Sequence, residues 1–186
     1  MSNTQSANPF STLALPARFD LDAASIERAY LSGLQTAHPD AGGAVDQSDD
    51  SVGDIPDAAT LNQARSILLD GEQRAVALLD LLGGPSAASC KELPDGFLME
   101  MMSRREEIEE ELAQGEQDAR SRWESWAREE RSQYASDAQS LFDEHTTDST
   151  PEKRTQIRVL LNAWRYIERL IEQLDPEYDP SQADFR

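Results

Sequence analysis

Few residues of this chain have the types and spacing that catalysis or metal binding requires. The sequence holds two histidines, His38 and His145, and a single cysteine, Cys90. The histidines lie more than a hundred residues apart, and one cysteine can form neither an internal disulfide nor a multi-cysteine zinc or iron–sulfur site. We therefore expect no metal site, no other cofactor, and no nucleophile that is activated by a histidine.

A glutamate-rich stretch from Glu106 to Glu111 is the remaining candidate for acid–base chemistry. Paired carboxylates can transfer protons, but these residues fall on a predicted helix that needs a solvated face, and we favour that structural role. Phosphate binding is also disfavoured, because Gly42-Gly43 is followed by Ala44 and acidic residues instead of a lysine. The sequence therefore indicates a protein that is not itself an enzyme.

One tripeptide, His38-Pro39-Asp40, stands out at the end of a predicted helix. By average residue usage, a chain of this length contains it by chance roughly one time in a hundred. Its ordinary structural interpretation is that His38 caps the helix end and Asp40 makes a turn. Taken alone, the tripeptide leaves a structural and a functional role equally open.

Acidic residues dominate the charge of the chain. Its 186 residues include 36 Asp and Glu against 17 Lys and Arg, which gives a net charge of −19. This charge disfavours a nucleic-acid partner and an anionic membrane surface. No apolar run approaches the roughly 20 residues that span a bilayer, and the first residues lack the basic and apolar segments of a secretory signal. We expect a cytoplasmic protein with no nucleic-acid and no membrane partner.

The elements that position these residues are predicted to be helices throughout, so the expected fold class is all-α. Apolar residues recur at helical spacing, and no stretch alternates for long enough to make a convincing strand. Asn8-Pro9 and Asp22 supply caps for two helices, and the second helix ends before Pro39. Residues 41–57 predict a mobile loop, after which two further helices end at Gly83-Gly84.

A second helical unit follows a predicted linker over residues 85–94. Three long helices joined by short turns predict an antiparallel bundle over residues 95–174. In the last of them, the apolar residues recur at spacings close to a heptad seam, after a cap and a proline at Thr150-Pro151. We expect residues 175–186 to form a disordered tail.

Several stretches of the sequence are similar to one known family. They are Asn8-Pro9-Phe10-Ser11-Thr12-Leu13 with Leu15-Pro16-Ala17-Arg18-Phe19-Asp20-Leu21-Asp22, the tripeptide, Leu61-Asn62-Gln63-Ala64, Phe97-Leu98-Met99-Glu100 with Arg105-Glu106-Glu107-Ile108, and Trp164-Arg165-Tyr166-Ile167-Glu168-Arg169-Leu170. At these residues the chain resembles the J-domain co-chaperones and, more closely, their iron–sulfur branch, the HscB proteins. The tripeptide alone would indicate a J-domain, whereas the Phe97-Leu98-Met99-Glu100 segment at this distance downstream points to HscB.

This resemblance implies a fold and a function. The implied fold is L-shaped, with a J-domain helical hairpin over residues 8–84 and a scaffold-binding three-helix bundle over residues 95–174. The implied protein is a co-chaperone that stimulates the ATPase of an HscA/DnaK-type chaperone through the tripeptide. It delivers an IscU-like iron–sulfur cluster scaffold protein to that chaperone and so assists the maturation of iron–sulfur proteins.

The resemblance also implies two sets of binding residues. The chaperone-binding positions are His38, Pro39, Asp40 and Arg28. The scaffold-binding positions are Leu98, Met99, Met102, Glu106, Glu110 and Tyr166. The alternative is that the apolar members are bundle core, which we favour for the neighbouring Met101 and Ile108 but not for the three apolar positions named.

Departures from the family pattern keep two other hypotheses open. J-domains usually carry basic residues on the helix before the tripeptide and a lysine after it, whereas here Ala41 follows, and no Lys or Arg occurs between Arg28 and Arg65. Steering toward an acidic chaperone surface should therefore be weak or adverse. Ser103 also replaces a common glutamate, and the four-cysteine zinc module of some relatives is absent. The alternatives are a J-domain adaptor that serves a general DnaK-type chaperone with another client, and a structural protein with a degenerate J-like domain.

Overall fold

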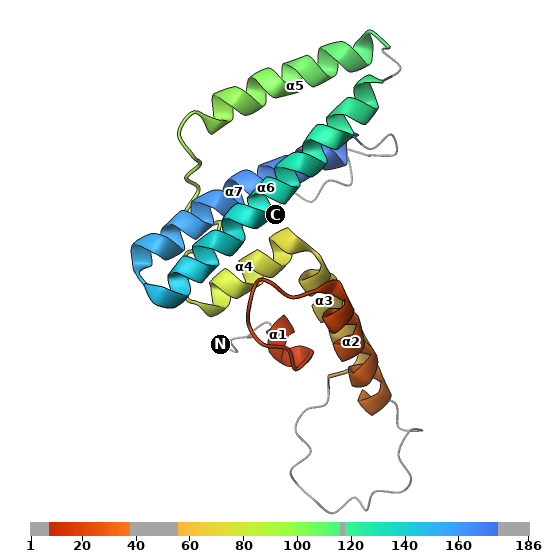
Figure 1. Cartoon of the computed structure of the whole chain (residues 1–186), viewed down its shortest axis with the longest axis vertical. Helices are drawn as coiled ribbons and strands as arrows, with labels where there is room; N and C mark the ends of the chain where they lie inside the picture. Colours follow the sequence, from red (N-terminus) through yellow and green to blue (C-terminus); the bar gives the residue numbers. More distant parts are fainter. Residues whose placement is uncertain (1–7, 38–55, 116–117, 175–186) are drawn as a thin grey trace, which may run out of the picture. The chain divides into compact units, whose positions relative to one another are not determined.

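The computed structural model describes residues 8–37, 56–115 and 118–174, and Figure 1 shows their helices. These residues contain no strand, which confirms the all-α fold class. Their helices are α1 (Pro9–Thr12), α2 (Ala23–Ala37), α3 (Ala58–Leu69), α4 (Gly71–Leu81), α5 (Phe97–Ala113), α6 (Ala119–Thr147) and α7 (Pro151–Leu174). The chain divides into two compact units, Met1–Gly83 and Gly84–Arg186. Most of the predicted 41–57 loop and the predicted 175–186 tail lie outside the described residues.

The helices of the first unit begin at polar caps that are close by in sequence. The side chain of Asn8 accepts a hydrogen bond from the Phe10 amide at 3.0 Å, with proline at the first helical position. Asp57 accepts from the Thr60 amide at 2.7 Å, which lowers the pKa of its carboxyl. Asp70 ends α3 and caps α4. Each cap satisfies a helix amide that has no partner within the helix.

Apolar side chains from all four helices form the core of this unit. Its fully buried members are Phe10, Ile26, Leu61, Leu68, Ala75 and Leu79. Gly33 of α2 faces one of them, because a Cβ added there would lie 2.9 Å from a terminal methyl carbon of Leu61. The missing side chain therefore lets α2 and α3 approach closely.

Two polar links also join α2 to α3. The Tyr30 hydroxyl donates to the side-chain oxygen of Asn62 at 2.6 Å. The Arg65 guanidinium donates from Nε to both carboxylate oxygens of Glu27, at 2.9 and 3.0 Å, and thereby lowers the pKa of that carboxyl. These links fix the register of the α2–α3 hairpin.

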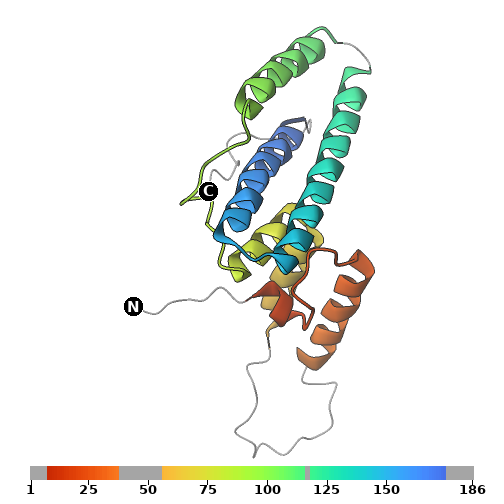
Figure 2. The same ribbon diagram turned by 60° about the vertical axis from the view of Figure 1, so that its left-hand side comes forward.

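In the second unit, α6 and α7 run side by side in opposite directions (Figures 1 and 2). The buried side chains of these two helices include Ala138, Phe142, Ile157, Leu161 and Trp164. Tyr134 stacks on Trp164 with ring centroids 6.4 Å apart. Burial raises the pKa of Tyr134 to about 12, because the charged phenolate would lose hydration.

Helix α5 packs on this pair through one narrow stripe of side chains. Phe97 and Met101 contact Ala163 and Ile167 of α7. Further along the helix, Ile108 joins a cluster that holds Trp123, Ala127 and Leu170. Between the two clusters, the Arg104 guanidinium carbon lies 5.7 and 5.4 Å from the ring centroids of Trp123 and Trp126. Most of the other α5 residues are exposed.

Candidate functional site

Of the chaperone-binding positions implied by the sequence, Arg28 is described. It is exposed on α2, and its guanidinium donates to the Ser25 hydroxyl at 2.8 Å. The tripeptide follows Ala37, the last residue of α2, and lies outside the described residues. Apart from Arg28, the charged residues of α2 and α3 are Glu27 and Arg65, which pair with each other. The described surface of this hairpin is therefore nearly neutral.

On the scaffold side, three large apolar side chains of α5 are exposed to solvent. Leu98, Met99 and Met102 expose 51%, 77% and 55% of their surfaces. The neighbouring Met101 and Ile108 are buried, at 3% and 4% exposed, which confirms their predicted role as core. The three exposed residues are therefore not core, and their side chains are available to a partner.

Helical geometry spreads the predicted scaffold-binding residues of α5 over one arc, from an edge beside the buried stripe to the opposite face. With about 100° per residue, Leu98 and Met102 lie about 100° and 140° around α5 from Phe97, beside the buried stripe. Met99, Glu106 and Glu110 lie at about 180° to 220°, on the face opposite that stripe. Both glutamates are exposed. The patch is thus an apolar edge near the core with a mixed apolar and acidic outer face.

Tyr166 of α7 lies at the apolar edge. Its ring packs edge-on against Phe97 with centroids 5.7 Å apart, and the tyrosine is half-buried. The Arg105 guanidinium donates a hydrogen bond to the Glu109 carboxylate, which raises the pKa of Arg105, with a smaller contribution from Tyr166. Because Phe97 directly precedes Leu98, this contact places Tyr166 beside the first turn of α5.

Two residues near this patch were missed by sequence reasoning. Arg158 is 3% exposed and donates from Nε to the Pro85 carbonyl at 2.9 Å. Asn162 donates from its side-chain amide to the carbonyls of Cys90 and Glu92, at 3.0 and 2.9 Å. Both residues interrupt the apolar pattern of the last helix, and that interruption was the available signal. The segment before α5 is therefore bound along α7.

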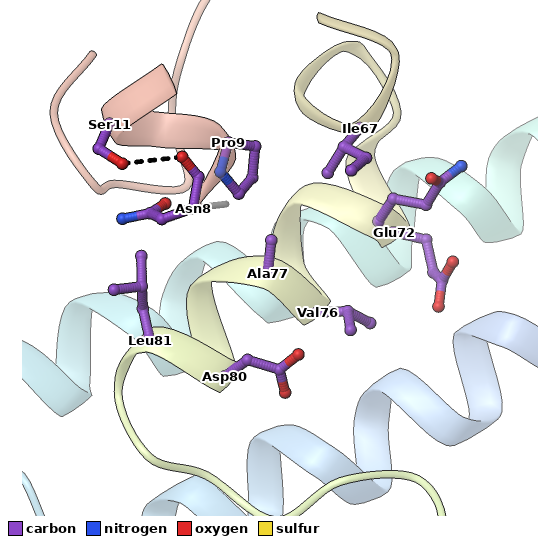
Figure 3. A pocket seen from close by; sticks show the side chains of 10 residues that line it. Asn8, Pro9, Ser11, Ile67, Glu72, Val76, Ala77, Asp80 and Leu81 are labelled. Atoms are coloured by element: carbon purple, nitrogen blue, oxygen red, sulfur yellow. Dashed lines mark hydrogen bonds between the residues drawn. The ribbon is translucent and has the colours of Figure 1, made fainter. Parts of the chain in front are cut away.

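The first unit contains a hollow of about 890 Å³ beside α1 and α4 (Figure 3). Its apolar lining includes Val76 and Ala77, and its polar lining includes Glu72 and Asp80. The Ser11 hydroxyl at its edge donates to the Asn8 carbonyl at 2.9 Å. Among the described residues that line the hollow there is no histidine, cysteine or lysine.

Within the described part of the chain, no group of three or more His, Cys, Asp or Glu side chains could hold a metal ion. In the same residues, no helix is both long and apolar enough to cross a membrane.

A family model matches the region that carries the α5 patch, and known proteins are similar to the chain. The family model described as "HSCB C-terminal oligomerisation domain" matches residues 93–175. A co-chaperone protein HscB homolog of Ralstonia nicotianae is 31% identical over 118 residues, which cover 63% of this chain and 66% of that protein. A homolog of the same name from Vibrio cholerae is 34% identical over 103 residues, which cover 55% of this chain and 60% of that protein. The chain belongs to the HscB family.

Solved HscB structures share the fold. The crystal structure of human co-chaperone protein HscB superimposes with a TM-score of 0.59 at 22% identity, over 94% of this chain and 85% of the human one. Chaperone HscB from Vibrio cholerae gives a TM-score of 0.56 at 23% identity, over 90% of this chain and 99% of the Vibrio one. The sequence matches span about two thirds or less of the length of these HscB relatives.

Proposed function

We propose that this HscB-family chain is a co-chaperone that links two proteins. Its first unit, over about residues 8–84, acts as a J-domain that stimulates the ATPase of an HscA/DnaK-type chaperone. Its bundle, over about residues 95–174, binds an IscU-like iron–sulfur cluster scaffold protein. In this proposal the chain acts in the cytoplasm. The observation that carries the proposal is the exposed apolar patch of α5, which lies within the region that the family model matches.

The chemistry of the tripeptide suits contact with a chaperone. Pro39 restricts its own backbone, which reduces the conformational entropy lost on docking. Asp40 offers a carboxylate that an arginine of the partner can bind through two hydrogen bonds. His38 offers a hydrogen-bond donor and an acceptor. In this proposal, Arg28 adds one exposed cation on the preceding helix, and the chain activates a partner's ATPase without an active site of its own.

The patch on α5 suits a transient protein partner. Methionine and leucine adapt to the shape of the surface they contact, and a few such anchors usually dominate the energy of an interface. The nearby carboxylates of Glu106 and Glu110 are exposed and would favour basic residues on the scaffold, mainly by increasing the rate of association.

The nearly neutral α2 favours a second candidate. Helix α2 carries one basic residue, which favours a J-like domain that no longer engages a chaperone. In that case the bundle alone would act, as a structural module. A J-domain adaptor for a general DnaK-type chaperone with another client is a related possibility. The two chaperone-binding candidates differ in the protein that binds the bundle.

A steady-state ATPase assay with the chaperone of the source organism tests the proposal. The wild-type chain should stimulate hydrolysis, and His38→Gln should abolish stimulation while it leaves the helical content unchanged. Mass analysis of proteins that copurify with the chain should identify an iron–sulfur scaffold. Stimulation that survives His38→Gln would contradict the role of the tripeptide, and a different client would favour the adaptor.

A further inference from the structure

The segment that leads into α5 is not helical, yet it is bound firmly to α7. Its carbonyls at Pro85, Cys90 and Glu92 all accept hydrogen bonds from side chains of α7. The Ser89 and Cys90 amides both donate to the Ser86 carbonyl at 3.0 Å, which forms a turn between the first and second attachments. We call residues 85–94 the strap.

The two donors to the strap lie in one row on α7 with Tyr166. Arg158, Asn162 and Tyr166 are spaced four residues apart, so they line one stripe of the helix. Arg158 binds the start of the strap, Asn162 binds its end, and Tyr166 contacts the residue that begins α5. The strap therefore follows this row and ends beside the apolar edge of the patch.

Short local contacts transmit the position of the strap to α5. Leu93 packs with Phe97 and Ile167 in the same apolar cluster. The Phe97 amide donates to the Pro94 carbonyl at 3.1 Å, and Gly96 adopts a left-handed conformation with φ of 77° to make the turn. Few residues separate Glu92 from Leu98, so the Asn162 hydrogen bonds limit where the first turn of α5 can lie.

From this geometry we infer that Asn162 is a positioning residue for scaffold binding. It holds the strap so that Leu98 and Met99 stand in a fixed place beside Tyr166, without itself belonging to the apolar patch. A patch that is fixed before docking loses less conformational entropy when it binds. The inference rests on the proposed function, since it assigns a task within the scaffold-binding bundle.

Titration calorimetry with the purified iron–sulfur scaffold protein of the source organism tests the inference on the full chain. Asn162→Asp keeps the size of the side chain but removes its donor, so scaffold affinity should fall by about tenfold, the scale of one or two lost hydrogen bonds. Gln156→Ala, at an exposed position of the same helix, should change affinity by less than about twofold.

Two further measurements separate positioning from other roles. In a chain that already carries Leu98→Ala and Met99→Ala, Asn162→Asp should reduce scaffold affinity little further, because the anchors that Asn162 positions are gone. Hydrogen exchange of the Cys90 and Phe97 amides should accelerate in Asn162→Asp, while the amides of Leu161 and Trp164 stay protected.

Three results would overturn the inference. One is unchanged affinity in Asn162→Asp, and another is the same loss of affinity whether or not the two anchors are present. The third is unchanged exchange at Cys90 and Phe97. Absence of scaffold binding by the wild-type chain is a different result, since it would overturn the proposed function itself and this inference with it.

Discussion

The α2–α3 hairpin and helix α5 present opposite kinds of surface. Helices α2 and α3 hold 15 and 12 residues, of which three are charged, and Glu27 and Arg65 pair with each other. Helix α5 holds 17 residues, and eight of them are charged. Yet the three exposed apolar side chains that we assign to scaffold binding lie on the charged helix.

The two regions also differ in how they are held. The hairpin is tied by buried contacts and by two polar links between its helices, whereas α5 is attached by one stripe of side chains and by the strap. Charged residues around α5 keep it hydrated while its apolar anchors stay exposed. In the proposed assignment, exposed apolar residues within a charged helix mark the docking surface, and charge density alone does not.

Removal of the apolar anchors should have the largest effect. Replacement of Leu98, Met99 and Tyr166 together by alanine should cost several kcal/mol of scaffold binding, the order typical of dominant interface residues. Titration calorimetry measures this loss. The matched control is Leu31→Ala, because Leu31 of α2 is 55% exposed, close to the 51% of Leu98, and its loss should leave scaffold affinity unchanged.

The same experiment contains a check on the fold. Leu98→Ala with Met99→Ala should leave the free energy of unfolding nearly unchanged, since both side chains are exposed. Undiminished scaffold affinity in a folded triple variant would show that these side chains are bystanders.

The pH dependence of stability should differ between the units. Burial raises the pKa of Tyr134 in the bundle to about 12, above an unfolded value near 10. Its protonated form is favoured on folding, so its contribution is present below about pH 10 and is lost as the pH rises through 12, by about 3 kcal/mol at most. Tyr134→Phe should remove this alkaline loss in denaturant titrations that follow the bundle.

The stability of the α2–α3 hairpin should instead fall at acidic pH. Hydrogen bonds to Glu27 and Asp57 lower the pKa values of both carboxyls. Their stabilisation is present above the ordinary carboxyl pKa of about 4 and is lost as the pH falls through the lowered values. Glu27→Gln should flatten the acid side of the stability profile of the first unit, and an unchanged profile would contradict this assignment.

The smallest predicted effect concerns the outer face of α5. Glu106→Gln with Glu110→Gln should slow scaffold association by a few fold and reduce its dependence on salt, because exposed charges act mainly on the rate of encounter. Stopped-flow kinetics at two ionic strengths measures both quantities. Glu152→Gln on α7 is the control, and an equal effect from it would show that net charge alone is responsible.

The local features of the fold could be predicted from sequence because their partners are close by. Asn8 was expected to cap α1, and Asp22 to cap α2, and Asp22 accepts from the Ser25 amide at 2.8 Å. Thr150 was expected to cap α7, and it accepts from the Lys153 amide at 3.3 Å. In each case a side chain meets an amide two or three residues away, so no tertiary information is needed.

The attachment of the strap could not be predicted in this way. Its composition indicated a linker, and its partners Arg158 and Asn162 lie 70 to 73 residues further along the chain. Such pairing depends on how α5 and α7 pack, which no local pattern encodes. The resemblance supplied the scaffold-binding positions, whereas the division of those positions between an edge and an outer face required the orientation of α5 around Phe97.

The central claim is that two sites on one chain act separately, and a single assay of chaperone ATPase with and without scaffold tests it most directly. We predict that His38→Gln loses stimulation in both conditions but still binds scaffold. The triple alanine variant of Leu98, Met99 and Tyr166 should stimulate the chaperone alone as the wild-type chain does, and should lose any additional stimulation that scaffold provides. If the triple variant loses stimulation without scaffold, or if His38→Gln keeps it, the assignment of two separate sites is wrong.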